Sequence, residues 1–437
     1  MNDFDMDFYK KLREFHRSKN VKTLLENFAY LSLLQVAGYV FPLLTYPYLA
    51  KVIGTEGFGK IAFASAVMIW LQTITDWGFN YTATRDVAVN RDNKEKISQI
   101  FSSVTWARVI LMSISYIILV VCVLVIPMLR EMWVVLLMTS LILPGQILFP
   151  EWLFQGIEKM KYITWLSLIS KIFFTACVFV FIREKDDYIL QPLFVSLGFM
   201  VSGLISLYFI MVRYGIRLKP FSRQDTIMAI KGSGDVFLNH LMPNLYNAFS
   251  VLLLGVWGGS VSNGIFDAGK KLVDVSNSFF AIVSRTFYPF LSRKIENHTF
   301  YVRINVILAL GVSVILFLLA PFFIDLLFTS AFTDAVVVMR IMCIGIFLLT
   351  LSDIYGKNYL ILIHKEKMLR NITFFCSILG FCISIPLVYY FDYIGAAVTL
   401  TICRGLIGIS TWKFATKIKK EYYEQVRECG KISESRM

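Results

Sequence analysis

Residues 99–126 read QIFSSVTWARVILMSISYIILVVCVLVI, an apolar run with one charged residue, Arg108. The run is long enough to cross the ~30 Å hydrocarbon core of a membrane as a helix, which takes roughly 20 residues. It lacks the alternation of apolar and polar residues that marks a barrel strand. Because lipid offers backbone groups no hydrogen bonds, this run predicts a membrane-spanning helix.

The rest of the chain has the same apolar character. Of 437 residues, 57% are hydrophobic and 17% are charged, and the mean hydropathy is +0.64. Soluble domains average roughly 45–50% apolar and ~25% charged residues. The composition therefore excludes a soluble enzyme and predicts an all-α integral membrane protein.

Apolar runs like the first recur along the chain and predict about twelve transmembrane helices. They cover residues 24–49, 58–81, 99–126, 132–154, 162–182, 188–212, 235–257, 263–290, 301–328, 333–356, 371–391 and 394–414. Six runs lie on each side of a basic segment, so we expect two six-helix bundles of the same orientation. The expected domains are a cytoplasmic N-terminal segment 1–23, a bundle 24–212, a cytoplasmic linker 213–234, a bundle 235–414 and a cytoplasmic tail 415–437.

The basic residues between these runs predict the orientation in the membrane. Most of the 43 Lys and Arg residues fall in alternate segments, beginning with the segment before the first run. The opposite segments hold only Lys51, Lys60, Arg130, Arg183 and Lys185. Since cytoplasmic loops carry the positive excess, both termini are expected in the cytoplasm. The net charge of +13 then suits a membrane surface, and nucleic-acid binding is not expected.

Several basic residues fall inside the predicted spans, where a charge costs roughly 2.5–3.5 kcal/mol. They are Arg108, Lys171, Lys270, Lys271, Arg285, Arg340 and Arg404. Such residues usually face a watery cavity, although Arg285, Arg340 and Arg404 fit equally well as snorkelling side chains. With Arg85, which follows the second run, the predicted cavity cations are Arg85, Arg108, Lys171, Lys270, Lys271 and Arg285. A net positive cavity suits an anion such as a pyrophosphate.

Acidic residues and amides complete the predicted cavity. Asp267, Lys270, Lys271 and Asp274 are spaced i, i+3, i+4 and i+7, so they share one stripe of a helix. Asp267 and Asp274 are expected to compensate the cations, and Asp76 to bind a coupling cation. The predicted polar lining consists of Asn239, His240, Asn244 and Asn247, which fit equally well as interhelical hydrogen-bonding residues worth ~0.6 kcal/mol each.

The first helix carries two prolines and leads into the most distinctive part of the sequence. Pro42 and Pro47 each remove a helix hydrogen bond, which predicts a bend. Residues 27–58, NFAYLSLLQVAGYVFPLLTYPYLAKVIGTEGF, are followed by DWGF at 76–79 and TATRDVAVNRD at 82–92. These motifs resemble the polysaccharide-export branch of the multidrug/oligosaccharidyl-lipid/polysaccharide exporter superfamily, and most closely the Wzx-type O-antigen flippases. Pro42, the turn at 51–59 and Arg85 match that pattern.

The resemblance implies a fold and a function. The fold is a two-lobed transporter whose six-helix bundles form a V around a cationic cavity, as in drug exporters of the MATE type. The function is translocation of undecaprenyl-pyrophosphate-linked oligosaccharide, the O-antigen repeat unit, from the cytoplasmic to the periplasmic leaflet of a bacterial inner membrane. Alternating access coupled to H⁺ or Na⁺ is implied, and polysaccharide polymerases are expected partners.

Two other functions stay open. A MATE-type drug/cation antiporter shares the fold but is expected to have an acidic cavity, whereas the basic residues here exceed the acidic ones. A membrane O-antigen polymerase or ligase needs a long external loop, and the predicted outer loops are short. The expectation is a transporter and not an enzyme. The four histidines, His16, His240, His298 and His364, are scattered, so neither a metal nor another cofactor is expected.

Overall fold

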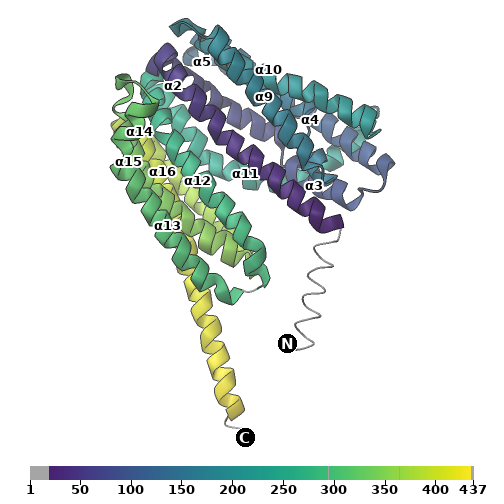
Figure 1. The fold of residues 1–437 in the computed structure, drawn as a ribbon, viewed down its shortest axis with the longest axis vertical. Helices are drawn as coiled ribbons and strands as arrows, with labels where there is room; N and C mark the ends of the chain where they lie inside the picture. Colours follow the sequence, from purple (N-terminus) through teal and green to yellow (C-terminus); the bar gives the residue numbers. More distant parts are fainter. Residues whose placement is uncertain (1–18, 294, 364, 435–437) are drawn as a thin grey trace. The chain divides into compact units, whose positions relative to one another are not determined.

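The computed structural model describes residues 19–434 except 294 and 364. Within these residues the chain is helical and contains no strand (Figure 1). The α-helices are α2 (Lys19–Asp76), α3 (Phe79–Val89), α4 (Lys94–Val125), α5 (Pro127–Glu131), α6 (Trp133–Ser140), α7 (Ile142–Leu148), α8 (Glu151–Gly156), α9 (Met160–Phe181), α10 (Leu190–Tyr208), α11 (Arg223–Trp257), α12 (Gly259–Arg293), α13 (His298–Leu318), α14 (Ala320–Leu327), α15 (Ala335–Leu351) and α16 (Glu366–Glu434). Short 3-10 turns η1 (Lys185–Ile189), η3 (Ile295–Asn297) and η4 (Ser330–Phe332) and π-helical segments η2 (Phe209–Arg213) and η5 (Ser352–Leu360) connect them.

Eight helical stretches of the described chain are long and apolar enough to cross a membrane. They are Ala29–Val89, Lys94–Val125, Trp133–Gly156, Met160–Phe181, Lys185–Arg213, His298–Leu318, Ala335–Leu360 and Glu366–Glu421. The first and the last each contain two of the predicted spans, joined across residues with non-helical backbone, Gly54 and Asp392. Leu241–Trp257 is apolar but shorter. The helical class of the fold is confirmed, and the count of twelve stays a prediction.

The first two predicted spans are joined in α2, and the polar segment after them is also helical. α2 runs through Pro42 and Pro47 without leaving helical geometry, and its one non-helical residue is Gly54, with φ 67°. Trp77 (φ 46°) and Gly78 (φ 81°) end α2, and α3 then covers TATRDVAV, which the sequence placed in a loop. A Cβ on Gly78 would lie 2.8 Å from Val236, so this tight break needs glycine.

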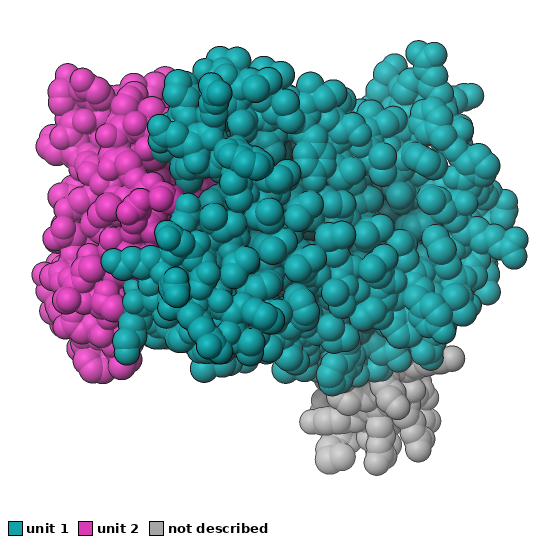
Figure 2. All heavy atoms as spheres, turned by 90° about the horizontal axis from the view of Figure 1, so that it is seen from above, with its two compact units in different colours: residues 1–52, 68–240 teal, residues 53–67, 241–437 magenta. Residues whose placement is uncertain are grey.

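The chain divides into two compact units, coloured separately in Figure 2. Unit 1 holds the described residues up to Val52 and Met68–His240, and unit 2 holds Ile53–Val67 and the described residues from Leu241. α2 therefore contributes to both units. The domain boundaries predicted from the sequence, at 213 and 234, stay a prediction.

The start of α11 packs inside unit 1. The indole N–H of Trp77 donates to the carbonyl of Ile230 at 3.0 Å, and the rings of Trp77 and Phe237 stack at 4.0 Å. Thr82 and Ser233 share a hydrogen bond of 2.7 Å. These contacts fix the segment before Pro243 against the break between α2 and α3. The helix thus begins well before the apolar run that predicted it.

The core of unit 1 lies around α8. Trp152, Leu153 and Phe154 are almost fully buried and pack with Phe79 and Phe101, among others. Burial of a large apolar side chain contributes roughly 1.5–3 kcal/mol. α8 is a short helix between Pro150 and Ile157, and this packing holds it firmly in place. The carboxylate of Glu151, one residue before Trp152, is therefore carried on a well-anchored element.

Candidate functional site

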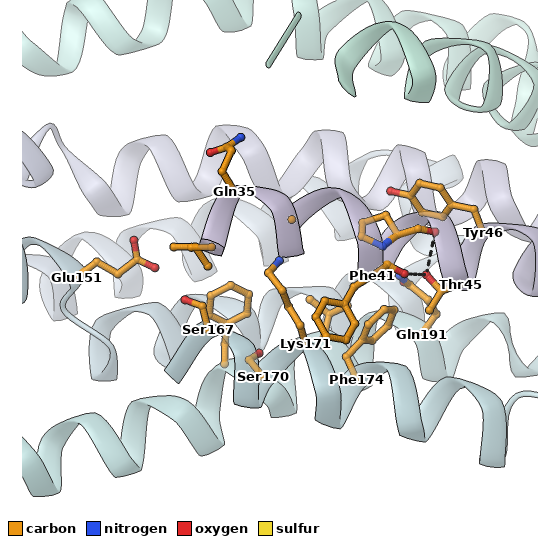
Figure 3. Close-up of a pocket in the computed structure, with 15 residues that line it drawn as sticks. Gln35, Phe41, Thr45, Tyr46, Glu151, Ser167, Ser170, Lys171, Phe174 and Gln191 are labelled. Carbon is orange, nitrogen blue, oxygen red and sulfur yellow. Dashed lines mark hydrogen bonds between the residues drawn. The ribbon is translucent and has the colours of Figure 1, made fainter. Parts of the chain in front are cut away.

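Unit 1 contains a cavity of about 430 Å³ formed by α2, α8, α9 and α10 (Figure 3). Its wall mixes apolar side chains with hydroxyl, amide and charged groups. The polar lining consists of Gln35, Thr45, Tyr46, Glu151, Ser167, Ser170, Lys171 and Gln191. Phe41, Phe174 and Phe199 supply aromatic surface. A mostly apolar pocket with a few convergent polar groups is the usual form of a ligand site.

Lys171 is the cation of this cavity. It lies in the middle of α9 and its side chain extends toward α2 (Figure 3). Ser167 and Ser170 lie on the same helix beside it, one turn or less away. An ammonium group offers three hydrogen-bond donors and no acceptor, so it favours an anionic or oxygen-rich ligand. The structure thus places one predicted cavity cation in a cavity.

Two features of α2 shape the opposite wall. A Cβ added to Gly38 would meet no atom within 4 Å, so the missing side chain leaves space in the cavity. Pro42 has no N–H, and the carbonyl of Gly38, four residues earlier, loses its usual donor within the helix. The hydroxyl of Thr45 donates to the carbonyl of Phe41 at 3.1 Å. Gly38 and Pro42 both line the cavity, and membrane helices tolerate a lost backbone hydrogen bond where the helix borders a cavity.

Glu151 marks the other end of the lining (Figure 3). It interacts electrostatically with Lys171, Asp76 and Arg108. Within the described residues, no basic group approaches its carboxylate within the 4.0 Å of an ion pair. Glu151 was not among the residues predicted from the sequence, although it is an acid inside the predicted span 132–154. A count of acidic residues in the spans, made as for the basic ones, would have found it.

Asp76 and Arg108, predicted as a coupling acid and a cavity cation, form an ion pair with each other. The Arg108 side chain is 5% exposed and also donates to the carbonyl of Gln146 at 3.3 Å. The pair joins the end of α2 to α4. The two charges compensate each other, and the pair stabilises the contact between α2 and α4.

Arg85 lies elsewhere, on the exposed surface of α3. Its side chain is 70% exposed and pairs with the neighbouring Asp86 at 3.1 Å. It does not line the cavity of unit 1. Its assignment to a substrate cavity stays a prediction.

The predicted stripe on α12 forms ion pairs within unit 2. Lys270 contacts Asp274 at 3.2 Å, and Lys271 contacts Asp267 at 3.0 Å. Arg404 of α16 lies 3.6 Å from Asp274. All of these side chains except that of Arg404 are partly exposed. Charge compensation is present in the structure, and a substrate role for the lysines stays a prediction.

The polar residues predicted on α11 are only partly visible. Asn244 and Asn247 are half-buried, and the amide of Asn247 donates to the carbonyl of Pro243 within its own helix at 3.0 Å. The side chains of Asn239, His240 and Arg285 lie outside those described. The roles of this group and the bends at Pro42 and Pro47 stay predictions.

Comparison with known proteins decides the family. Residues 24–295 match the profile of a family described as "Polysaccharide biosynthesis protein". The chain belongs to this family. Two curated relatives are each named "Putative O-antigen transporter". The one from Escherichia coli (strain K12) is 28% identical over 396 residues, which cover 89% of this chain and 95% of the relative. The one from Shigella dysenteriae is 24% identical over 390 residues, 87% of this chain and 97% of the relative.

Two solved structures share the fold of this chain. The lipid II flippase MurJ in its inward closed conformation matches with a TM-score of 0.69 and 14% identity, over 90% of this chain and 87% of that one. An inward-facing multidrug resistance MATE family transporter of the MOP superfamily matches with a TM-score of 0.67 and 13% identity, over 91% and 99%. These findings confirm the resemblance to the polysaccharide-export branch and the MATE-like helical fold. The chain is a multi-pass membrane protein.

Proposed function

We propose that this chain is a flippase that moves an undecaprenyl-pyrophosphate-linked oligosaccharide, the repeat unit of an O-antigen, from the cytoplasmic to the periplasmic leaflet. The observation that carries the proposal is the match, along nearly the whole chain, to two relatives named as O-antigen transporters. Those names also confirm the expectation of a transporter rather than an enzyme. The distribution of Lys and Arg supports an inner-membrane location with both termini in the cytoplasm.

The cavity of unit 1 supports this proposal chemically. A lipid-linked sugar phosphate presents anionic oxygens, hydroxyl groups and flat apolar sugar faces. Lys171 supplies a cation for the first, and the hydroxyls of Ser167 and Ser170 supply partners for the second. Phe41 and Phe174 supply aromatic surface for the third. We assign part of the head group to this cavity, with Lys171 as its anion-binding residue.

Coupling to H⁺ or Na⁺ is part of the same proposal. The sequence suggested Asp76 as the coupling acid, but Arg108 already pairs with Asp76. Glu151 lines the cavity itself and belongs to the same electrostatic cluster as Lys171. We therefore assign the coupling cation to Glu151. Binding an anion at Lys171 removes the positive charge that offsets Glu151, which favours cation uptake by its carboxylate.

The drug/cation antiporter is the alternative with the same fold. The cavity of unit 1 carries Lys171 and Glu151 together, so the sign of its charge does not separate the two functions. The MATE family transporter reported above shares 13% identity with this chain, and a likeness at that level is evidence for the fold alone. The names of the full-length relatives favour the flippase. A polymerase or ligase finds no support among these relatives.

Complementation tests the proposed function. The chain is expressed in a bacterium that lacks its O-antigen flippase, with the donor's repeat-unit genes present, and the polysaccharide ladder is recorded. Wild type is expected to restore the ladder, and Lys171→Ala to abolish it at an unchanged membrane level. Lys185→Ala, which alters an exposed lysine of η1, is the matched control and is expected to behave as wild type. A wild-type chain that inserts but restores no ladder contradicts the proposal.

A further inference from the structure

A second cavity lies in unit 2, far from Lys171 in the sequence and not lined by any residue of the unit 1 cavity. It is a groove of about 960 Å³ along α16. Lys365 and Lys367 line one end, and Phe375, Leu379, Leu406 and Phe414 line its walls. Neither the family match, which ends at residue 295, nor the proposed substrate site covers this groove.

The groove arises because α16 doubles back on itself. Asp392 has non-helical backbone (φ 52°) and separates two helical limbs. A Cβ on Gly380 would lie 2.1 Å from the sulfur of Cys403, so the limbs are in close contact there. Towards the end that bears the lysines, the larger side chains of Phe375 and Phe414 stand partly exposed on either side. The two antiparallel limbs thus contact each other closely near Gly380 and leave a groove between them near Phe375 and Phe414.

The groove is amphipathic along its length. From Lys367 to Leu379 the first limb rises about 18 Å at ~1.5 Å per residue. One leaflet of the hydrocarbon core is roughly 15 Å thick, half of ~30 Å. The apolar walls therefore match the depth of one leaflet. The two exposed lysines fall between the predicted spans 333–356 and 371–391, in a segment expected at the membrane surface. Glu366 also lines this end and takes part in an interaction of its own. The end of the groove therefore carries two cations and one acid.

We propose that this groove is a binding site for one anionic glycerophospholipid, whose phosphate contacts Lys365 and Lys367 and whose acyl chain lies between Phe375, Leu379 and Leu406. Charge complementarity favours an anionic over a zwitterionic lipid, because a zwitterionic head group is attracted less strongly by the two ammonium groups. Basic pockets between membrane helices on the cytoplasmic side are known to bind anionic head groups. The site needs no substrate, so it stands independently of the flippase proposal.

Native mass spectrometry of the full chain tests this site. The protein is reconstituted in nanodiscs of equal parts phosphatidylglycerol and phosphatidylcholine and then released. Wild type is expected to retain one phosphatidylglycerol. Each lysine near a lipid surface contributes about 1 kcal/mol, so Lys365→Gln with Lys367→Gln is expected to weaken retention about 25-fold, which corresponds to about 2 kcal/mol.

A matched pair of lysines separates a specific site from general surface charge. Lys94→Gln with Lys96→Gln removes two exposed lysines at the start of α4 in unit 1 and is expected to leave retention unchanged. Ser410→Phe, which fills the groove and keeps both lysines, is expected to release the lipid. Equal retention of phosphatidylcholine, equal loss in the Lys94/Lys96 variant, or full retention in both groove variants would overturn the proposal. A monodisperse elution profile confirms that each variant is folded.

Discussion

The ion pair between Asp76 and Arg108 offers a sharp test of how unit 1 is held together. Asp76→Asn keeps the shape of the side chain and removes its charge. Arg108, whose side chain is 5% exposed, then keeps the carbonyl of Gln146 as a partner but loses its counter-charge. The cost of this change is the loss of the one carboxylate of the described residues in direct contact with this buried cation, which leaves only the longer-range charge of Glu151 to offset Arg108.

The expected size of the effect follows from burial. Removal of one partner from a buried ion pair costs about 3–5 kcal/mol. The Asp76 side chain is 30% exposed, so solvent screens part of the interaction, and we expect the lower end, about 3 kcal/mol. At roughly 2–4 °C per kcal/mol for a unit of this size, the unfolding temperature is expected to fall by roughly 6–12 °C.

Thermal unfolding in detergent, followed by tryptophan fluorescence, measures this difference. The double variant Asp76→Asn with Arg108→Gln is expected to recover most of the loss, because it removes the buried cation together with its partner. Asp86→Asn breaks the exposed pair with Arg85 and is the matched control, with an expected change within about 0.5 kcal/mol. A structural role for the Asp76–Arg108 pair is contradicted if Asp76→Asn costs no more stability than Asp86→Asn, or if the losses in the double variant simply add.

Three further changes have distinct expected results. Gly38→Leu places a side chain in the unit 1 cavity and is expected to lower transport about tenfold or more, while the better helix propensity of leucine leaves stability unchanged or raises it by up to about 1 kcal/mol. Gly311→Leu, which also adds a side chain in open space, is the control, and equal transport by both variants would contradict a substrate site in the cavity. Glu151→Gln is expected to make sugar export independent of the ion gradient, measured with a protonophore and with sodium-free medium, and unchanged gradient dependence excludes Glu151 as the coupling acid. Gly59→Ala would put a Cβ 1.6 Å from the carbonyl oxygen of Ser260 and is expected to destabilise unit 2 by about 1–3 kcal/mol in thermal unfolding. A variant as stable as wild type would contradict a tight contact between the helix segments that carry Gly59 and Ser260.

The sequence predicts the class of this fold well because lipid leaves few alternatives. Long apolar runs such as 99–126 must be helices in a membrane, and the structure has helices there. Periodicity within one helix is equally reliable, so the spacing of Asp267 and Lys271 correctly brings the two into one stripe. Helix ends are harder to predict. α3 is helical because it packs on α4 and α8, and nothing in its polar sequence indicates that packing.

The site was predicted less completely, for a physical reason. Arg108 was identified from the cost of a charge in a membrane and Asp76 as a possible coupling acid, but their pairing was not predicted, because they lie 32 residues apart on different helices. Which faces those helices present to each other depends on their rotation, which hydropathy does not fix. Lys171 was found for the same reason as Arg108. Glu151 was missed because the expected anionic ligand directed attention to cations.

Translocation in proteoliposomes measures directly whether this chain moves the lipid-linked sugar across a membrane. The purified chain is reconstituted with undecaprenyl-pyrophosphate-linked repeat unit in both leaflets, and a membrane-impermeant glycosidase is added outside. With an imposed ion gradient, wild type is expected to make nearly all of the lipid-linked sugar accessible, and Lys171→Ala is expected to leave about half protected, as in empty liposomes. If wild type leaves the same half protected as empty liposomes do, the chain does not flip this lipid, which contradicts the proposed function.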